Sequence, residues 1–151
     1  VPADMNLAVG ELTKLKIILS DMWLEAMPGE KDAADIYSKV KEMSASDADI
    51  EFVLLYYAAA FESIMGVMNK QHVGVDTLRD GGTFAVLRKM KEKGIVDDER
   101  YRLLDRARNI RNRVAHRFHE ITALPEDQKH AQAKSLRIAI QAAHECLCAA
   151  V

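Results

Sequence analysis

Cysteine is scarce in this chain of 151 residues, and its two cysteines are poorly spaced to pair with each other. Cys146 and Cys148 lie two positions apart, so on a helix their side chains point toward different faces and a disulfide between them is disfavoured. We therefore expect free thiols, and a reducing cytoplasmic location is the simplest interpretation.

An excess of charge of either sign is also missing. The formal net charge is −2, with 49% hydrophobic and 29% charged residues, which is the balance of an ordinary soluble globular protein. A strongly basic chain would bind nucleic-acid phosphates over its whole surface. Because this chain is not basic overall, any contact with nucleic acid must be local.

Long apolar runs are absent by inspection. The longest extends from Phe52 to Phe61 and has charged neighbours, whereas a membrane-spanning helix needs about 20 apolar residues. No basic N-terminal region leads into an apolar segment and a cleavage site, so we expect no secretion signal and no membrane partner. Residues 1–4 are expected to be an added remnant or a disordered tail before a native start at Met5, with a native start at Val1 as the alternative.

What the sequence does contain is apolar residues at a period of about 3.6, which predicts helices. The expected fold class is all-α: a single domain over residues 1–151, built as one bundle of about five to six helices. We expect helices over residues 7–27, 32–43, 47–70, 83–93, from 97 or 98 to 118, and from 124 toward the C-terminus. No internal repeat or low-complexity tract interrupts this pattern.

Local signals set the expected helix boundaries. Pro125 is typical of a first helical turn, and residues 76–82 are expected to form a loop that ends in an Asp-Gly-Gly turn. Capping side chains are expected from Ser44 or Ser46 for the third helix and from Asp97 or Asp98 for the fifth. The middle of the third helix is apolar on all sides, so its second buried side is either the centre of the bundle or a subunit interface.

The fifth helix is unusually basic. Seven of the ten arginines lie between Arg100 and Arg117, where Asp105 is the only acidic residue. A solvated face is the ordinary explanation for such a run. On a helical wheel, however, Arg111 lies at the edge of the apolar stripe, beside which a guanidinium must find acceptors. We expect that stripe to face the core, and it comprises Leu103, Ala107, Ile110, Val114 and Phe118.

The opposite side of this helix gathers groups suited to phosphate chemistry. Asn109, Asn112, Arg113 and His116 follow i, i+3, i+4, i+7 spacing, and His119 with Glu120 extends the surface. An imidazole exchanges protons near neutral pH, and an arginine can hold a phosphate through two parallel hydrogen bonds. Together these groups are suited to metal-free cleavage of a phosphodiester.

The segment Arg111-Asn112-x-x-x-His116 resembles the Arg-polar-x-x-x-His signature of HEPN domains, which are small helical bundles. The position of the motif, late in a long helix with one further helix after it, also resembles that family. Many HEPN proteins are metal-independent endoribonucleases that act at a cleft between two protomers. In the usual scheme, the RNA 2′-hydroxyl attacks the adjacent phosphate and leaves a 2′,3′-cyclic phosphate.

The resemblance implies a role for each matching residue. His116 would be the general acid or base, Arg111 the phosphate clamp and Asn112 an orienting residue. Further contacts to RNA phosphates are expected from Arg108, Arg113, Arg117 and His119. The implied protein is a dimerising, cytoplasmic, HEPN-like ribonuclease that binds RNA rather than DNA and uses no cofactor. It would act as a toxin or phage-defence effector with an antitoxin protein as partner.

Two features set limits on this hypothesis. Phe118 stands where many HEPN toxins paired with a nucleotidyltransferase antitoxin carry a tyrosine, which argues against control through modification of that hydroxyl. Arg111 and His116 are separated by about 140° on an ideal helix. Both can therefore reach one phosphate only if the arginine bends round, if the helix breaks nearby, or if a second chain completes the site.

Two alternatives remain open from the sequence. The chain could be a HEPN-like module that binds nucleotides or proteins without chemistry, or an unrelated helical regulatory dimer in which the arginines form a solvated face. A metal site at His144-x-Cys146-x-Cys148 is disfavoured, because only His144 and Cys148 share a helix face and no fourth ligand is evident.

Overall fold

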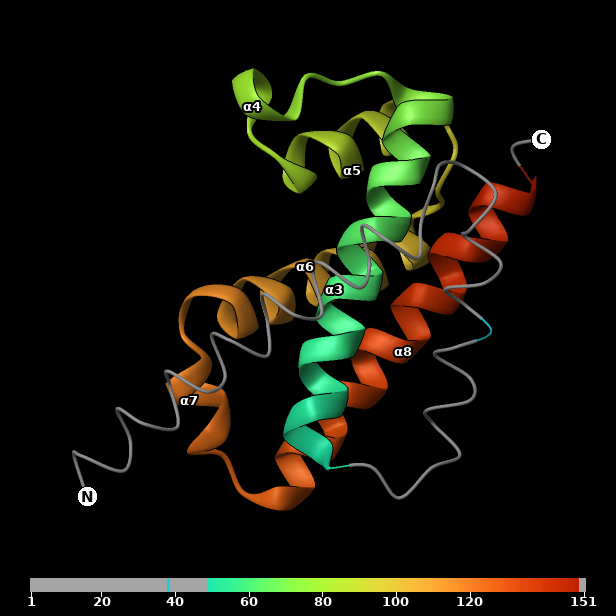
Figure 1. Ribbon diagram of the computed structural model, residues 1–151. Coiled ribbons are helices and arrows are strands. Elements are labelled where there is room, and N and C mark those ends of the chain that lie inside the picture. Colours follow the sequence, from blue (N-terminus) through green and yellow to red (C-terminus); the bar gives the residue numbers. More distant parts are fainter. Residues whose placement is uncertain (1–37, 39–48, 150–151) are drawn as a thin grey trace.

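The computed structural model describes residue 38 and residues 49–149, and within them it contains helices and no strands (Figure 1). The expected all-α class is therefore confirmed for this part of the chain. The helices expected over residues 7–27 and 32–43 lie outside the described residues, apart from Ser38, which is helical. The elements are α3 Ile50–Met68, η2 Asn69–Val73, α4 Thr77–Asp80, α5 Thr83–Glu92, α6 Asp98–His116, α7 Phe118–Thr122 and α8 Glu126–Ala149.

The start of α3 differs from the expectation of a serine cap. Asp49 is the N-cap residue, and its carboxylate accepts hydrogen bonds from the backbone N–H groups of Glu51 and Phe52. The expected caps Ser44 and Ser46 are therefore wrong for this helix. A carboxylate placed one residue before the helix satisfies two of the free N–H groups of the first turn, and it also suits the helix dipole.

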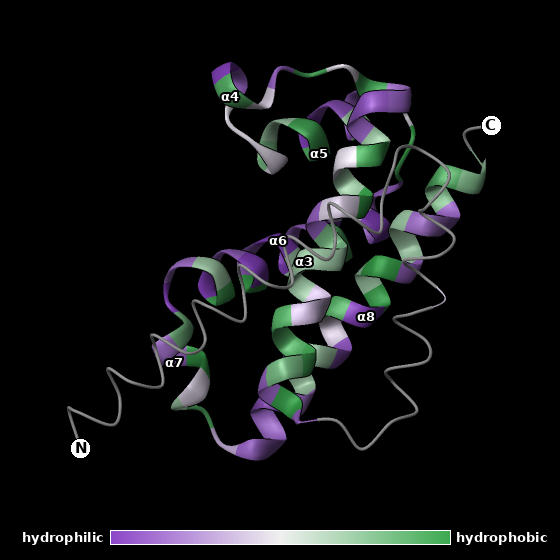
Figure 2. Ribbon diagram, viewed as in Figure 1, coloured by the Kyte–Doolittle hydropathy of each residue, from purple (hydrophilic) through white to green (hydrophobic). Residues whose placement is uncertain are grey.

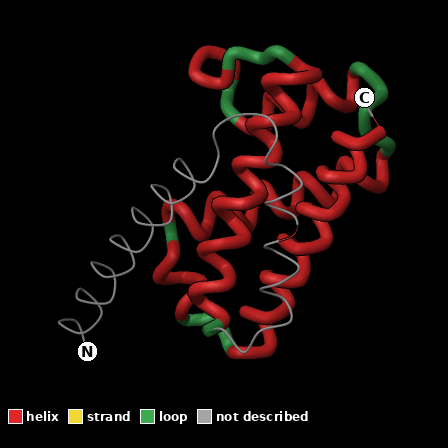
Figure 3. The backbone as a smooth tube through the Cα atoms, turned by 45° about the vertical axis from the view of Figure 1, so that its right-hand side comes forward, coloured by secondary structure: helices red, strands yellow, loops and turns green. Residues whose placement is uncertain are grey.

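Three long helices, α3, α6 and α8, pack against one another and form the core (Figures 1 and 3). Phe61 and Ile64 of α3 are fully buried, together with Leu104 of α6 and Leu136 and Ile140 of α8. Figure 2 shows α3 as a largely hydrophobic helix. Ten of its 19 residues are buried, so the expectation that this helix is covered on more than one side is confirmed.

The helix formed by α3 and η2 together is longer and more apolar than was expected from the uninterrupted run Phe52 to Phe61. Over Ile50–Val73, 24 residues, it is long and apolar enough to cross a membrane, and half of its most apolar window is buried inside the protein. The run that ends at Phe61 continues beyond Glu62 through further apolar residues to Met68, so the helix is longer than the uninterrupted run suggested. Core helices of soluble proteins satisfy the same criterion, and α3 packs on α6 and α8 as such helices do.

The expected loop at residues 76–82 contains one helical turn. Asp76 caps α4 through hydrogen bonds from the backbone N–H groups of Leu78 and Arg79. The chain then turns at Gly81 and Gly82, with φ of 106° and 71°, a backbone region that favours glycine. The expected turn is therefore present, and the expectation of a loop without helix is wrong at Thr77–Asp80, where the Asp76 cap supports a short turn.

Helix α6 follows the expected pattern with two differences. Asp97 caps it, as expected, through the backbone N–H of Arg100. Leu104 is buried and faces the core, whereas Leu103, which was expected to do so, is only half-buried. The core therefore lies toward the edge of the apolar stripe that is nearer to Leu104. The helix ends at His116 instead of continuing to Phe118, since Arg117 leaves helical geometry at φ −138° and ψ 47°. Helix α8 begins at Glu126, two residues later than expected, so Pro125 directly precedes its first turn instead of lying in it.

Candidate functional site

The guanidinium of Arg111 has several polar partners and lies against Glu62 of α3. Its Nε donates to Glu62 Oε2 at 3.1 Å, and its Nη2 pairs with Glu62 Oε1. Its Nη1 donates to Asn112 Oδ1 at 3.1 Å. The Arg111 side chain is 20% exposed, so the expectation that a cation beside the core must find acceptors is confirmed.

Asn112 interacts with the arginine of the motif. Its side-chain oxygen accepts from Arg111, so its amide group helps to fix the guanidinium. Among residues 49–149, the structure records no hydrogen bond between Asn112 and His116, although they are an i, i+4 pair. The contact that the structure shows for the Asn112 side chain is therefore with Arg111.

His116 occupies the last position of α6 and is exposed to solvent. Its ring makes no hydrogen bond or ion pair with any residue that the structure describes. Directly after it, Arg117 interrupts the helix and α7 begins at Phe118. Arg111 and His116 both lie within α6, and the helix breaks only after the histidine, so this break does not bring the two side chains together.

The other arginines expected to bind phosphate already have carboxylate partners. Arg108 bonds to Asp105 at 2.9 Å and lies over the ring of Phe84, with its central carbon 5.0 Å from the ring centre. Arg113 and Arg117 each lie 3.7 Å from the same carboxylate oxygen of Glu120. The basic run is therefore partly neutralised, by Asp105 within it and by Glu120 just beyond it.

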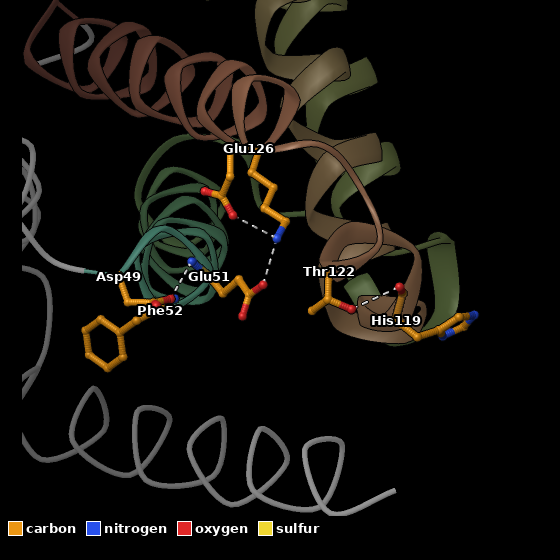
Figure 4. Close-up of polar contacts among 7 residues, drawn as sticks. Asp49, Glu51, Phe52, His119, Thr122 and Glu126 are labelled. Carbon is orange, nitrogen blue, oxygen red and sulfur yellow. Dashed lines mark hydrogen bonds and ion pairs between the residues drawn. The ribbon is translucent and has the colours of Figure 1, made fainter. Parts of the chain in front are cut away.

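His119 is exposed on α7, and only its backbone takes part in a contact that the structure shows. The hydroxyl of Thr122 donates to the His119 carbonyl at 3.0 Å, while the imidazole points away from this bond (Figure 4). The ring of His119 is thus accessible to solvent, as is the ring of His116, which lies three residues earlier in the chain.

Two further arginines of α6 were not singled out in the sequence. Arg102 and Arg106 are exposed, and neither forms an ion pair within the described part of the chain. Their spacing of four residues, continued by Asn109, Arg113 and His116, was the available signal, because it places all five positions on one face of the helix.

Two surface grooves lie away from the motif. One, of about 370 Å³, is formed near Val73 and Phe84, and its rim carries Arg88 and Lys89. The other, of about 250 Å³, lies between α6 and α8. Neither of these two grooves is lined by Arg111 or His116.

The cysteine-containing end of α8 was the other candidate site. Cys148 Sγ lies 3.9 Å from His144 Nε2, as expected for residues that share a face, while Cys146 is buried on another side. Burial raises the pKa of the Cys146 thiol, an effect that the nearby Arg100 opposes. Within residues 49–149, no three His, Cys, Asp or Glu side chains are placed to hold a metal ion.

No family model, curated protein or solved structure matches this chain. The resemblance to HEPN domains therefore rests on the sequence motif and on its position in the chain.

Proposed function

We propose that this protein is a HEPN-type, metal-independent endoribonuclease. The observation that carries the proposal is the end of α6, where an exposed imidazole at His116 follows the firmly held guanidinium of Arg111 on the same helix. An accessible proton-transfer group and an oriented cation are the two components that transesterification of RNA requires. A proton-transfer role for His116 needs such an accessible ring.

The proposed reaction is attack of the RNA 2′-hydroxyl oxygen on the adjacent phosphorus. His116 accepts the hydroxyl proton as the new O–P bond forms, and the bond from phosphorus to the 5′-oxygen breaks. The departing 5′-oxygen takes a proton and leaves a free hydroxyl, while the other product ends in a 2′,3′-cyclic phosphate. A second imidazole is needed for simultaneous acid and base roles, and His116 of a second copy would supply it in a homodimer.

Arg111 retains the capacity to bind a phosphate in spite of its partners. A guanidinium has five N–H donors, and the contacts to Glu62 and Asn112 use three of them. Two donors therefore remain for phosphate oxygens. In this proposal Glu62 and Asn112 hold the group in place, so less conformational freedom is lost when the substrate binds.

A second candidate function is binding of a nucleotide or a protein without chemistry. It is favoured by the carboxylate partners of Arg108, Arg113 and Arg117. Arginines that already pair with carboxylates attract the many phosphates of an RNA substrate more weakly than free arginines do, which favours recognition of a smaller ligand or of a protein. Under this alternative, the same helix takes part in recognition, and His116 has no role in proton transfer.

RNA cleavage in the presence of EDTA tests the proposal. His116→Ala should lower the cleavage rate by about 10²–10⁴-fold, the usual cost of losing a general acid or base, and Arg111→Ala should also abolish measurable cleavage. Arg137→Ala is the matched control, because Arg137 is an exposed arginine on α8. Circular dichroism of each variant checks that the helices are retained.

The substrate provides a second control. A strand with 2′-deoxyribose at the scissile position has no attacking hydroxyl and should remain intact, and the cleaved RNA should carry a cyclic phosphate. Equal cleavage by the wild-type protein and both motif variants would reject the ribonuclease. Absence of cleavage together with measurable nucleotide or protein affinity would favour the binding module.

The proposed biological setting is a cytoplasmic toxin or phage-defence effector that is restrained by an antitoxin protein. Induced expression should then slow growth of a bacterial host, and His116→Ala should relieve that effect at equal protein level. Light scattering of the purified protein tests the homodimer. If an active nuclease left growth unaffected, the ribonuclease activity would stand and the proposed toxin role would be rejected.

A further inference from the structure

A line of polar side chains follows the exposed side of α6, and we call it the α6 ridge: Arg102, Arg106, Asn109, Arg113 and His116. Successive members are four, three, four and three residues apart, which keeps them on one face of the helix. At 1.5 Å per residue, the ridge is about 21 Å long. It ends at His116, the proposed proton-transfer group.

The ridge differs from the rest of the basic helix in its charge balance. Arg102 and Arg106 have no ion-pair partner among the residues that the structure describes, whereas Arg108 and Arg111 are held by Asp105 and Glu62. The uncompensated positive charge of α6 therefore lies on the ridge. It is concentrated toward the N-terminal half, away from the histidine.

Acidic groups limit this charge at both ends. Asp98 and Glu99 are exposed in the first turn of α6, where Asp98 pairs with Lys91 at 3.5 Å. At the other end, Glu120 of α7 lies near Arg113. A polyanion is therefore attracted to the part of α6 that lies between these acids. This part of the helix is about as long as the ridge.

We infer that the α6 ridge binds the sugar-phosphate backbone of single-stranded RNA and guides the strand to His116. This inference rests on the proposed function, and it adds the substrate contacts that the motif alone does not supply. Arg102 and Arg106 contact phosphates, and Asn109 offers an amide to a phosphate or a 2′-hydroxyl. A flexible single strand also permits the in-line approach of the 2′-hydroxyl that an A-form duplex restrains.

The chemistry of the ridge favours RNA over an acidic protein. None of its five members is apolar, whereas the centre of a specific protein interface is rich in apolar and aromatic side chains. Contacts to a polyanion need no such centre, because release of counterions supplies the binding energy. The Leu103 side chain belongs to the neighbouring groove between α6 and α8 and is not part of the ridge.

Binding is best measured with a substrate that resists cleavage. The probe is a labelled, unstructured oligouridylate with 2′-O-methyl groups, followed by fluorescence anisotropy at several salt concentrations. Each lost phosphate contact should reduce the slope of log affinity against log salt by about 0.7 for single strands. Arg102→Ala with Arg106→Ala should therefore reduce it by about 1.4 and weaken binding at low salt.

The control variant removes the same charge elsewhere. Arg79 on α4 and Arg137 on α8 are both exposed, and Arg79→Ala with Arg137→Ala should leave the slope unchanged. Equal slopes for the ridge and control variants would overturn the inference. The inference would also be overturned if the ridge variant lost affinity for polyglutamate but not for RNA. That result would identify an acidic protein as the partner.

This inference and the ribonuclease can fail separately. Because the probe cannot be cleaved, its affinity does not depend on His116 as a proton-transfer group. If the ridge variant cleaved RNA as well as the wild type, with an unchanged KM, the ribonuclease activity would be supported and RNA binding by the ridge would be rejected. If the protein cleaved no RNA but bound the probe through the ridge, RNA binding by the ridge would be supported and the ribonuclease activity would be rejected.

Discussion

Glu62 and Arg111 face each other across the contact between α3 and α6, with both carboxylate oxygens directed at two nitrogens of the guanidinium. Glu62 is 52% exposed and Arg111 is 20% exposed, so the pair lies at the surface with the arginine on the inner side. Two-point contacts of this kind fix the orientation of the guanidinium as well as its charge. The pair is therefore a structural link between two core helices and a component of the proposed site.

Replacing Glu62 tests both roles. Glu62→Gln keeps the size of the side chain and removes its charge, so we expect unfolding in urea to become easier by about 1 kcal/mol, as for a partly exposed ion pair. We also expect tighter binding of the uncleavable RNA, because the charge of Arg111 is no longer neutralised. Anisotropy measures the affinity, and weaker binding by this variant would show that Glu62 serves mainly to position Arg111.

The matched control for this experiment is Glu92→Gln on α5. Glu92 lies 3.6 Å from Lys89 and 3.9 Å from Arg88 within one exposed helix, so its loss should change stability very little. Because Glu92 pairs with residues of its own helix and not with an arginine of α6, any effect of this variant on RNA affinity measures general charge alone.

The Glu62–Arg111 contact also shows where inference from the sequence ends. The wheel indicated that Arg111 would need acceptors, because it lies at the edge of the apolar stripe. The identity of the acceptor could not be predicted, since Glu62 is 49 residues away and only the packing of α3 on α6 brings the two together. The same applies to Arg113 and Glu120, which meet because the chain turns at Arg117.

Asn69 is the residue on which the turn between η2 and α4 depends. Its Nδ2 donates to the Val75 carbonyl at 2.9 Å, and its Oδ1 accepts from the Val75 backbone N–H at 2.8 Å. Asn69→Ala leaves two partly buried backbone groups without this partner, so we expect a loss of about 1–3 kcal/mol in unfolding free energy. Urea titration measures it.

A graded substitution separates the two hydrogen bonds of Asn69. Asn69→Asp keeps the acceptor for Val75 and loses the donor, so its cost should fall between those of the wild type and the alanine variant. Gln71→Ala is the control, because Gln71 is exposed in the same π-helical segment. If Asn69→Ala were no more costly than Gln71→Ala, the two bonds would contribute nothing measurable to stability.

The two cysteines should differ in reactivity although they are two residues apart. Cys148 is exposed and Cys146 is buried, and burial raises the pKa of the Cys146 thiol, so less of its reactive thiolate forms near neutral pH. Iodoacetamide should therefore label the native protein mainly at Cys148 and should label both thiols in urea. Mass spectrometry reads the sites, with Cys148→Ser as the control that should remain nearly unlabelled when folded. Equal labelling of both thiols in the folded protein would contradict the burial of Cys146.

Local signals predicted more of the fold than of the site. The cap at Asp97 and the turn at Gly81 are set by neighbouring residues, and each agrees with the structure, while Pro125 indicated the start of α8 to within two residues. The choice of Leu104 over Leu103 as the buried residue depends on the direction from which α3 and α8 approach α6. A wheel gives the centre of an apolar stripe, but neighbouring helices decide which of its edges is covered.

Lys129 is a buried charge, and its partners decide how stability changes with pH. Its Nζ lies 2.9 Å from Glu51 of α3 and 3.3 Å from Glu126 of the same helix. Both glutamates are labelled in Figure 4. The hydrogen bond to Glu51 raises the pKa of Lys129, and Glu126 adds to this, while burial acts in the opposite direction. The net shift is upward.

The sign of the pH effect follows from this shift. Because the pKa of Lys129 is higher in the folded than in the unfolded protein, its contribution is fully present below the unfolded value, about 10.4 for lysine. It is lost as the pH rises through the folded value. Lys129→Met should therefore cost about 1–3 kcal/mol near neutral pH, and the difference from the wild type should shrink only at alkaline pH.

Urea titrations of the wild type and Lys129→Met at neutral pH and across the alkaline range measure this convergence. Lys134→Met provides the control, because Lys134 is an exposed lysine of the same helix, and its difference from the wild type should remain small throughout. Glu51→Gln should cost more than Glu126→Gln, since Glu51 makes the shorter bond and joins α3 to α8. A gap between the wild type and Lys129→Met that widens at alkaline pH would show that burial, rather than Glu51, controls the ionisation of Lys129.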